Sequence, residues 1–274
     1  MGARARKQTR TPSLPNEPFR MSNTNKVWTA ALVVIGDEIL SGRTQDKNVA
    51  QIARWLQVQG IRLSEVRVVS DGMDTIAHAV NALRSTHDYL FTTGGIGPTH
   101  DDITVDAVAA ALDVEVVVHP EAKKMLVDYY ADKPGGLTDA RLRMARVPAG
   151  ADLIPNRMSG APGIKYGNIF LMAGVPHITA QMLDGLTGTL EGGAPLLSET
   201  VGCWTAESEV AEILREVEKA HDDCQIGSYP FFREGRIGAN FVIRSTSDEV
   251  LQSAVDTLCE ALGEEGYDFT PGGI

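Results

Sequence analysis

The sequence predicts an α/β protein whose parallel sheet carries helices on both faces, followed by a small α+β domain. Strand-like and helix-like apolar patterns alternate with short connections from residue 28 onward, as is typical of a covered parallel sheet. After the segment EGGAP at 191–195, the order changes to strand, helix, two strands, helix and strand. That second order indicates a split two-layer domain.

The elements of the larger domain follow from local patterns. Residues 28–35 form a near-continuous apolar run ending at Gly36, which predicts a strand buried on both faces. Further strands are predicted at 61–69, 89–93, 114–118 and 168–172. Helices with one apolar face are predicted at 48–60, 76–83, 105–112, 121–147 with a break at 133–136, and 176–186. Gly60 is placed to end the first of these helices, and Asp74 to cap the second.

The glycine-rich segment 191–195 predicts a linker. It divides the chain into a tail at 1–24, a first domain at 25–190 and a second at 196–274. Strands of the second domain are predicted at 200–205, 225–229, 236–244 and 267–270, and its helices at 207–220 and 248–262.

Composition narrows the class of protein. The chain has 274 residues, 43% of them hydrophobic and 22% charged, as in ordinary soluble domains. The net charge of -11 argues against a general partner of nucleic acid or of an anionic membrane. No apolar stretch is long enough to span a bilayer. We therefore expect a cytoplasmic protein with no nucleic-acid or membrane partner.

The termini and the cysteines add two expectations. The tail at 1–24 is basic and contains prolines but no apolar centre, so we expect disorder rather than a secretory signal, with Met21 as an alternative start. Cys203, Cys224 and Cys259 show no metal-ligand spacing, which indicates reduced thiols.

The segment TTGGIGPTHDDIT at 92–104 joins a glycine turn to two acids. It follows a strand, and ligands of parallel sheets bind beyond the carboxyl ends of the strands. Gly94, Gly95 and Gly97 allow positive φ and close backbone approach. Their N–H groups, followed by a helix start near Ile103, suit an anion such as phosphate. The alternative is a plain tight turn, because neither a P-loop nor a dinucleotide fingerprint is present.

Acidic residues surround this predicted turn. Asp101 and Asp102 either cap the next helix or hold a hard cation together with phosphate oxygens. Asp37, Glu38 and Asp71 follow the first two strands and either complete an acidic rim or serve as caps. Two further residues are candidates for contact with the ligand. His100 either donates to phosphate or stays solvated, and Gly174, between a strand and a helix, is placed to line the cleft.

Four segments resemble one family. GDEILSG at 36–42 and TGGIGPTHDDIT at 93–104 resemble the molybdopterin-binding (MoaB/Mog-like) superfamily. Within it, the chain is similar to the N-terminal domain of CinA-type proteins and to the molybdopterin-binding-like domain of eukaryotic FAD synthases. RTQDKN at 43–48 and IGSYP at 226–230 favour the latter branch. The resemblance implies a three-layer sandwich with a mostly parallel sheet, and a homo-oligomer.

The resemblance also implies an activity. Molybdopterin adenylyltransferases carry Gly-x-Gly, three residues, then Arg-Asp-x-Thr; here Asp101 stands at the arginine position, while Asp102 and Thr104 match. Relatives with Asp-Asp imply hydrolysis of a nucleotide diphosphate such as ADP-ribose or FAD, with a divalent ion of the Mg, Mn or Co class. The alternatives are a module that binds molybdopterin or a nucleotide without turnover, and adenylyl transfer to molybdopterin.

The leading hypothesis assigns roles to individual residues. Asp101 and Asp102 are the predicted metal ligands, and Asp37 is a further ligand or general base, so these three are the catalytic candidates. Gly94, Gly95 and Gly97 supply the phosphate cradle, and Thr99 and Thr104 have a positioning or a capping role. The full set of ligand-binding candidates is Gly36, Glu38, Asp71, Thr93, Gly94, Gly95, Gly97, Thr99, His100, Thr104 and Gly174. The sequence ends before any region like a CinA amidase or an adenylyl-transfer domain, so neither activity is expected.

Overall fold

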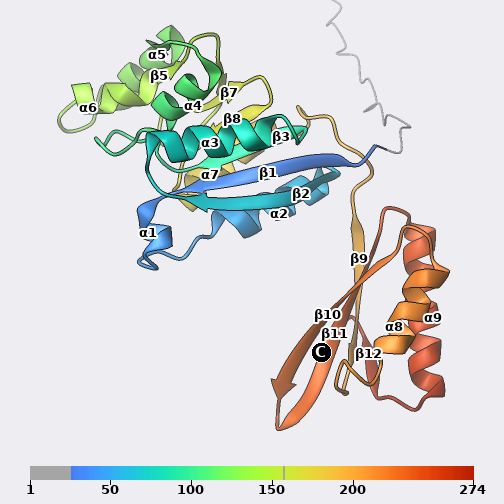
Figure 1. Cartoon of the computed structure of the whole chain (residues 1–274). Helices are drawn as coiled ribbons and strands as arrows, with labels where there is room; N and C mark the ends of the chain where they lie inside the picture. Colours follow the sequence, from blue (N-terminus) through green and yellow to red (C-terminus); the bar gives the residue numbers. More distant parts are fainter. Residues whose placement is uncertain (1–25, 157) are drawn as a thin grey trace, which may run out of the picture.

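The computed structural model describes residues 26–156 and 158–274, which form a larger and a smaller unit (Figure 1). The larger unit is built on a six-stranded sheet with the strand order β2-β1-β3-β8-β7-β6. β1 pairs in parallel with β2 and β3, and β3 with β8, whereas β7 is antiparallel to both β8 and β6. The mostly parallel sheet is confirmed. Its strands are β1 (Trp28–Ile35), β2 (Ile61–Val69), β3 (Tyr89–Thr93), β6 (Asp152–Ile154), β7 (Gly163–Tyr166) and β8 (Ile169–Met172).

Helices cover both faces of this sheet, because β1 presents apolar side chains alternately to each side. Its odd-numbered residues Ala31, Val33 and Ile35 pack with α3 (Met73–Arg84) and α4 (Thr104–Leu112). Its even-numbered residues, from Ala30 to Val34, pack with α2 (Asn48–Val58) and α7 (Pro176–Leu186). The result is a three-layer sandwich, in which the short helix α1 (Asp37–Leu40) follows β1 directly.

The segment between α4 and β6 differs from the prediction. The strand predicted at 114–118 shrinks to β4 (Val116–Val118), which lies outside the main sheet and pairs antiparallel with β5 (Arg146–Pro148). Both edges of β3 are already occupied by β1 and β8, so this strand has no place beside it. The helical pattern over 121–147 gives α5 (Pro120–Tyr130), α6 (Asp139–Leu142) and the 3-10 turn η1 (Arg143–Ala145). The strands β6 and β7 were not predicted.

A second local prediction is also wrong. Asp74 does not cap α3, because that helix starts at Met73 with Gly72 as its N-cap residue and no side-chain cap. Asp74 lies inside the first turn instead, where a negative charge still favours the helix dipole.

The smaller unit has the predicted β-α-β-β-α-β order. Its four antiparallel strands lie in the order β10-β11-β9-β12, and both helices pack on one face of this sheet (Figure 1). The first helix begins at 211 rather than at 207. The elements are β9 (Leu197–Cys203), α8 (Ala211–Ala220), β10 (Gln225–Arg233), β11 (Arg236–Ser245), α9 (Asp248–Glu264) and β12 (Phe269–Pro271).

The linker between the units is held against the larger one. The N–H of Gly193 donates to the carbonyl of Gly60 at 3.0 Å, and the Gln57 amide Nε2 donates to the Leu196 carbonyl at 2.9 Å. A Cβ on Gly192 would lie 1.8 Å from the carbonyl oxygen of Gln59, so glycine is required there. These contacts fix the linker beside the turn between α2 and β2.

Three expectations concern features outside the fold itself. The predicted basic tail at 1–24 lies outside the described residues. No helix in the described part of the chain is long and apolar enough to cross a membrane. All three cysteines are free thiols, and burial raises the pKa of each one.

Candidate functional site

The glycine turn lies at the carboxyl end of β3, between the ends of β1 and β8. Gly94 and Gly95 have φ values of +99° and +67°, which L side chains rarely adopt. A Cβ on Gly94 would lie 2.2 Å from the Ile35 carbonyl oxygen, and one on Gly95 would lie 2.1 Å from the Thr104 hydroxyl. Both positions therefore require glycine, for conformation and for space.

Hydrogen bonds to both neighbours fix this turn. The N–H of Gly94 donates to the Met172 carbonyl of β8 at 3.1 Å. The Thr104 hydroxyl, at the start of α4, donates to the Gly94 carbonyl at 2.9 Å, and the Thr104 N–H donates to the Gly95 carbonyl at 3.0 Å. Thr104 thus has contacts that suit the positioning role predicted for it.

The turn leaves several polar groups without partners. Within the described residues, the N–H groups of Gly95, Ile96 and Gly97 make no hydrogen bond to backbone or side chain. The hydroxyl of Thr93 is buried and also has no partner there. Successive free N–H groups just ahead of a helix form a concavity of positive potential, which suits an anionic ligand.

Asp102 folds back onto the glycine turn. One of its carboxylate oxygens accepts hydrogen bonds from the Thr99 N–H, at 2.7 Å, and from the Thr99 hydroxyl. A Cβ on Gly97 would lie 2.7 Å from the same oxygen. The capping alternative is wrong for both aspartates, because the N-cap residue of α4 is Ile103 and no side chain caps that helix. Thr99 and Asp102 instead close the loop on itself.

Asp101 and His100 extend into solvent beside this closed loop. Their side chains are 67% and 99% exposed, with Nδ1 of His100 3.9 Å from the Asp101 carboxylate. The pKa of Asp101 is lowered, first by the neighbouring Thr99 hydroxyl and then by its own backbone N–H. The hydroxyl proton itself is directed to Asp102, so the Asp101 carboxylate lies open to solvent.

A second acidic group comes from the ends of β1 and β2. The N–H of Asp37 donates to the Asp71 carboxylate at 2.8 Å, so Asp71 holds the start of the short helix α1. Burial is the largest cause that raises the pKa of Asp71, and the charges of Asp37, Glu38 and Asp101 raise it further. Acidic residues that follow β1 and β3 therefore lie close enough to Asp71, after β2, to raise its pKa. Gly36 anchors this corner through its N–H, 3.1 Å from the Val69 carbonyl.

Sequence reasoning missed two residues that contact this site. The Asn48 amide Nδ2 donates to the Gly174 carbonyl at 2.8 Å, and its buried Oδ1 has no partner among the described residues. The Arg143 guanidinium donates to the Asp102 carbonyl at 3.3 Å. A polar residue starting a helix after the first strand's loop could have indicated Asn48, whereas no local signal indicates Arg143.

The donor set determines which metal could bind. Within residues 26–156 and 158–274, no three or more His, Cys, Asp or Glu side chains are grouped closely enough to hold an ion by themselves. The oxygen donors at this edge are carboxylates, which suit a hard cation such as Mg²⁺ that takes one or two carboxylates and completes its shell with phosphate oxygens and water. The residues therefore fit a divalent ion that arrives with a phosphate ligand.

Family comparisons cover both units. Residues 31–192 match the family described as probable molybdopterin binding domain, and residues 195–269 match the FAD synthase middle domain. The boundary between the two matches coincides with the linker.

Individual relatives agree with these matches. A CinA-like protein of Desulfosudis oleivorans is 37% identical over 61% of this chain and 42% of its own length. A probable FAD synthase of Caenorhabditis elegans is 29% identical over 89% of this chain and 52% of its own length. The chain thus spans about half the length of these two relatives. The crystal structure of CinA from Thermoplasma acidophilum, a protein with unknown function, has a TM-score of 0.54 at 30% identity and covers 58% of this chain and 96% of that one.

Proposed function

Since the chain belongs to the family of probable molybdopterin binding domains, we propose that its glycine turn binds the phosphates of a nucleotide diphosphate and that the protein hydrolyses the pyrophosphate link. ADP-ribose and FAD are the substrates that this proposal names. Water attacks one phosphorus, and the bridging P–O bond breaks. ADP-ribose would give AMP and ribose 5-phosphate, and FAD would give AMP and FMN.

One observation carries the proposal. The carboxylates of Asp37 and Asp101 both lie close enough to Asp71 to raise its pKa, and the nearby turn has free N–H groups that suit an anion. Acids and phosphate repel each other unless a cation lies between them. A sheet edge that combines both supports binding of phosphate together with a divalent ion.

The residues of the turn would bind and orient the substrate. The N–H groups of Gly95, Ile96 and Gly97 would donate to phosphate oxygens, while Thr104 keeps the turn in place through Gly94. Arg143, held at the Asp102 carbonyl, places a positive charge near the position where the adenylyltransferases carry arginine. Such fixed donors stabilise charge that develops on the phosphates during the reaction.

The acids would hold the ion and a water molecule. Asp101 and Asp102 are the proposed ligands, and Asp37 is a further ligand or the general base that accepts a proton from the attacking water. A bound Mg²⁺, Mn²⁺ or Co²⁺ ion would lower the pKa of that water and offset the phosphate charge. The Asp102 carboxylate already serves Thr99, so one oxygen maintains the loop and the other remains for the ion.

The test is a search for AMP. The purified protein is incubated with ADP-ribose or FAD and with Mg²⁺, Mn²⁺, Co²⁺ or a chelator, and the products are separated by chromatography. We expect AMP with at least one ion and none with the chelator. Asp128→Ala, which changes an exposed carboxylate on α5, is the control and should keep full turnover.

Two other outcomes would replace this proposal. Calorimetric binding of a nucleotide or of molybdopterin with no AMP from either substrate would indicate a binding module. AMP incorporated into molybdopterin, and only when the pterin is supplied, would indicate adenylyl transfer.

A further inference from the structure

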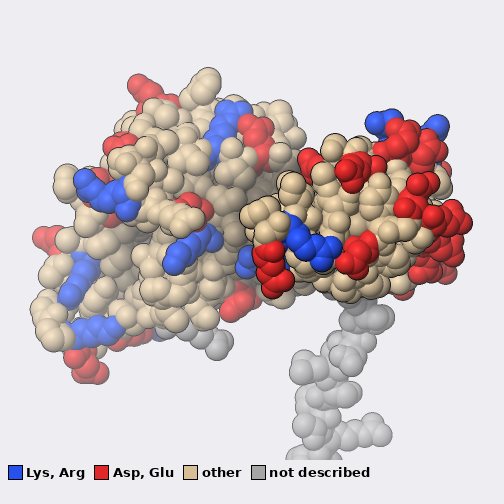
Figure 2. Space-filling view, turned by 90° about the horizontal axis from the view of Figure 1, so that it is seen from below, with Lys and Arg blue, Asp and Glu red and all other residues tan. Residues whose placement is uncertain are grey.

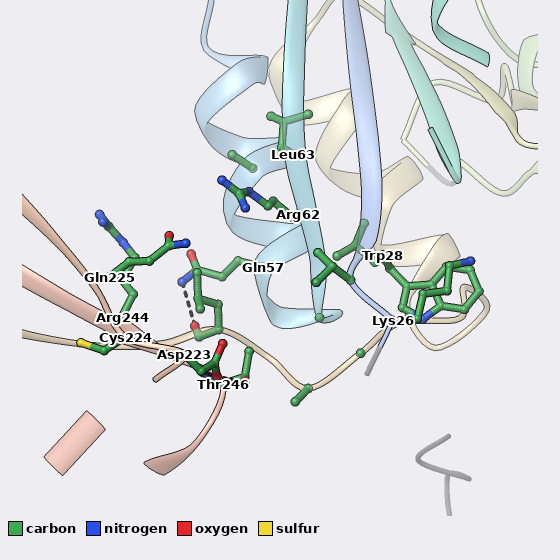
Figure 3. Close-up of a pocket in the computed structure, with 17 residues that line it drawn as sticks. Lys26, Trp28, Gln57, Arg62, Leu63, Asp223, Cys224, Gln225, Arg244 and Thr246 are labelled. Carbon is green, nitrogen blue, oxygen red and sulfur yellow. Dashed lines mark hydrogen bonds between the residues drawn. The ribbon is translucent and has the colours of Figure 1, made fainter. Parts of the chain in front are cut away.

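A cavity of about 830 Å³ lies between the two units (Figure 3). Its walls come from the start of β1, the turn between α2 and β2, the linker, and the ends of β10 and β11 that face the larger unit. Trp28 lies in this cavity, whereas Gly36 at the other end of β1 belongs to the glycine-turn site. At about 3.3 Å per strand residue the two places are roughly 26 Å apart. The cavity is therefore separate from the site described above.

The cavity gathers positive charge in an acidic protein. Lys26, Arg62 and Arg244 line it, and Asp223 is the one acid among the described residues of its lining. Lys26 is paired with Asp88 at 2.6 Å, so the two arginines carry the uncompensated positive charge. The Asp223 carboxylate is already an acceptor for the Thr246 N–H, at 3.1 Å, and for the Thr246 hydroxyl. Acidic side chains crowd over the helices of the smaller unit in Figure 2. The cavity is thus a local exception to the net charge of -11.

The two arginines have no ionic partner within residues 26–156 and 158–274. Arg244 donates to the hydroxyl of Tyr229 at 2.7 Å, a neutral acceptor that leaves the guanidinium charge uncompensated. Arg62 extends from β2 towards Gln225 of β10 across the space (Figure 3). One arginine thus comes from each unit.

The remaining wall can hold an organic body. The Trp28 ring is already engaged within the chain, by Tyr89 with centroids 5.9 Å apart and by the Lys26 ammonium, which lies 3.5 Å from the ring centroid. Val27, Leu63 and Leu196 supply the apolar surface of the lining. A volume of this size is typical of small-molecule sites, which are mainly apolar with a few convergent polar groups.

We propose that this interdomain cavity binds a phosphorylated organic molecule of about mononucleotide size. The phosphate would lie between the guanidinium groups of Arg62 and Arg244, because guanidinium binds phosphate through paired, charge-assisted hydrogen bonds. The organic part would pack against this apolar wall. A ligand held by both units would also restrain their relative orientation.

Hydrogen exchange of the full chain, read by mass spectrometry, tests this site with AMP as the probe. AMP should slow exchange at 60–63 and 223–226, and inorganic phosphate alone should do so more weakly. Arg62→Gln and Arg244→Gln, tested separately, should each weaken this protection by about tenfold or more, the effect of losing a charge-assisted hydrogen bond. Arg84→Gln, which changes an arginine at the end of α3 outside the cavity, should leave it unchanged.

Two controls keep the test decisive. Thermal melting checks that each arginine variant is folded. If one of the two variants fails to fold, the other still tests the site independently. Adenosine, which has the base and sugar but no phosphate, should give no protection at 60–63 and 223–226. The proposal is overturned if saturating AMP protects only the glycine turn at 93–104, or if adenosine protects the cavity as well as AMP does.

Discussion

The backbone N–H of Asp37 donates to the carboxylate of Asp71 at 2.8 Å, which joins the residue after β1 to the residues after β2. The bond holds two acids together although their charges repel, and Glu38 and Asp101 add to that repulsion. The repulsion among these carboxylates therefore destabilises the folded protein, and a bound cation would reduce it.

Because the pKa of Asp71 is raised, replacing its carboxyl group should change the free energy of unfolding by an amount that depends on pH. The folded protein binds the proton of the Asp71 carboxyl group more tightly than the unfolded chain does, because the pKa of this group is raised on folding from its ordinary value of 3.8. The stabilising contribution is therefore present below that value and is lost as the pH rises through the folded pKa. Asp71→Asn should raise the free energy of unfolding at pH 7, by up to about 1 kcal/mol, with little change near pH 3.

Urea unfolding at the two pH values measures this difference. The amide introduced by Asp71→Asn would keep an oxygen for the Asp37 N–H, so the hydrogen bond is preserved while the charge is removed. Asp132→Asn, in the exposed turn after α5, is the control and should show no such pH dependence. A stabilisation of Asp71→Asn that is equal at both pH values would contradict the charge argument.

Asp102 combines a loop contact with a charge, and two substitutions separate these roles. Asp102→Ala removes both, whereas Asp102→Asn keeps an acceptor for the Thr99 N–H. If Asp102 binds the ion, both variants should lose about 10²-fold or more in kcat/KM for ADP-ribose, as expected for a charge-stabilising group. Recovery of turnover in Asp102→Asn would show that the residue only closes the loop.

Gly95 should tolerate no side chain. Its φ of +67° and the 2.1 Å approach of a Cβ to the Thr104 hydroxyl predict that Gly95→Ala lowers the free energy of unfolding by about 1–3 kcal/mol. Gly188→Ala is the matched control, because its φ is +75° but no atom lies within 4 Å of the added Cβ. If both variants lose the same stability, backbone strain alone explains the effect and the steric contact does not.

Asn48 should matter for both stability and ligand binding. Asn48→Ala removes the buried bond to the Gly174 carbonyl, which should cost about 1–3 kcal/mol on unfolding and weaken nucleotide binding measured by calorimetry. Gln51→Ala on the same helix is the comparison, since its amide donates to the Pro176 carbonyl at 3.1 Å from a less buried position. Equal losses of binding in the two variants would argue against a specific role for Asn48.

The bounds of β1, β2, β3 and α7 agree with the patterns. For the central strands β1 and β3 the reason is that a strand between two helical layers needs a near-continuous apolar run, whereas the edge strand β2 alternates between covered and exposed residues. The short strands β6 and β7 pair antiparallel with the strands that follow them in the chain, and with three and four residues they are too short to show a periodic apolar pattern. The late start of α8 has a local cause, since the Thr205 hydroxyl bonds to Glu209 at 2.6 Å in a preceding turn.

The site was predicted in its backbone but not in its side-chain contacts. The need for glycine at 94 and 95 follows from the motif, and the geometry agrees at both positions. Gly97 has no positive φ, and a Cβ there would meet only the end of the Asp102 side chain. Which groups Asp102 and Asp71 contact depends on loop conformation, which no periodic pattern specifies. Arg143 approaches Asp102 from 41 residues away in the chain, so its presence follows only from tertiary structure.

Helix α2 is tied to a different part of the molecule at each end. Its first residue, Asn48, donates to the loop carbonyl of Gly174, and in the turn after its last residue the Gly60 carbonyl accepts from the linker. A helix of this length is a stiff rod of roughly 16 Å. Displacing the linker would tilt this helix and would therefore shift the Asn48 amide as well. Helix α2 thus links the linker mechanically to the loops around the glycine turn.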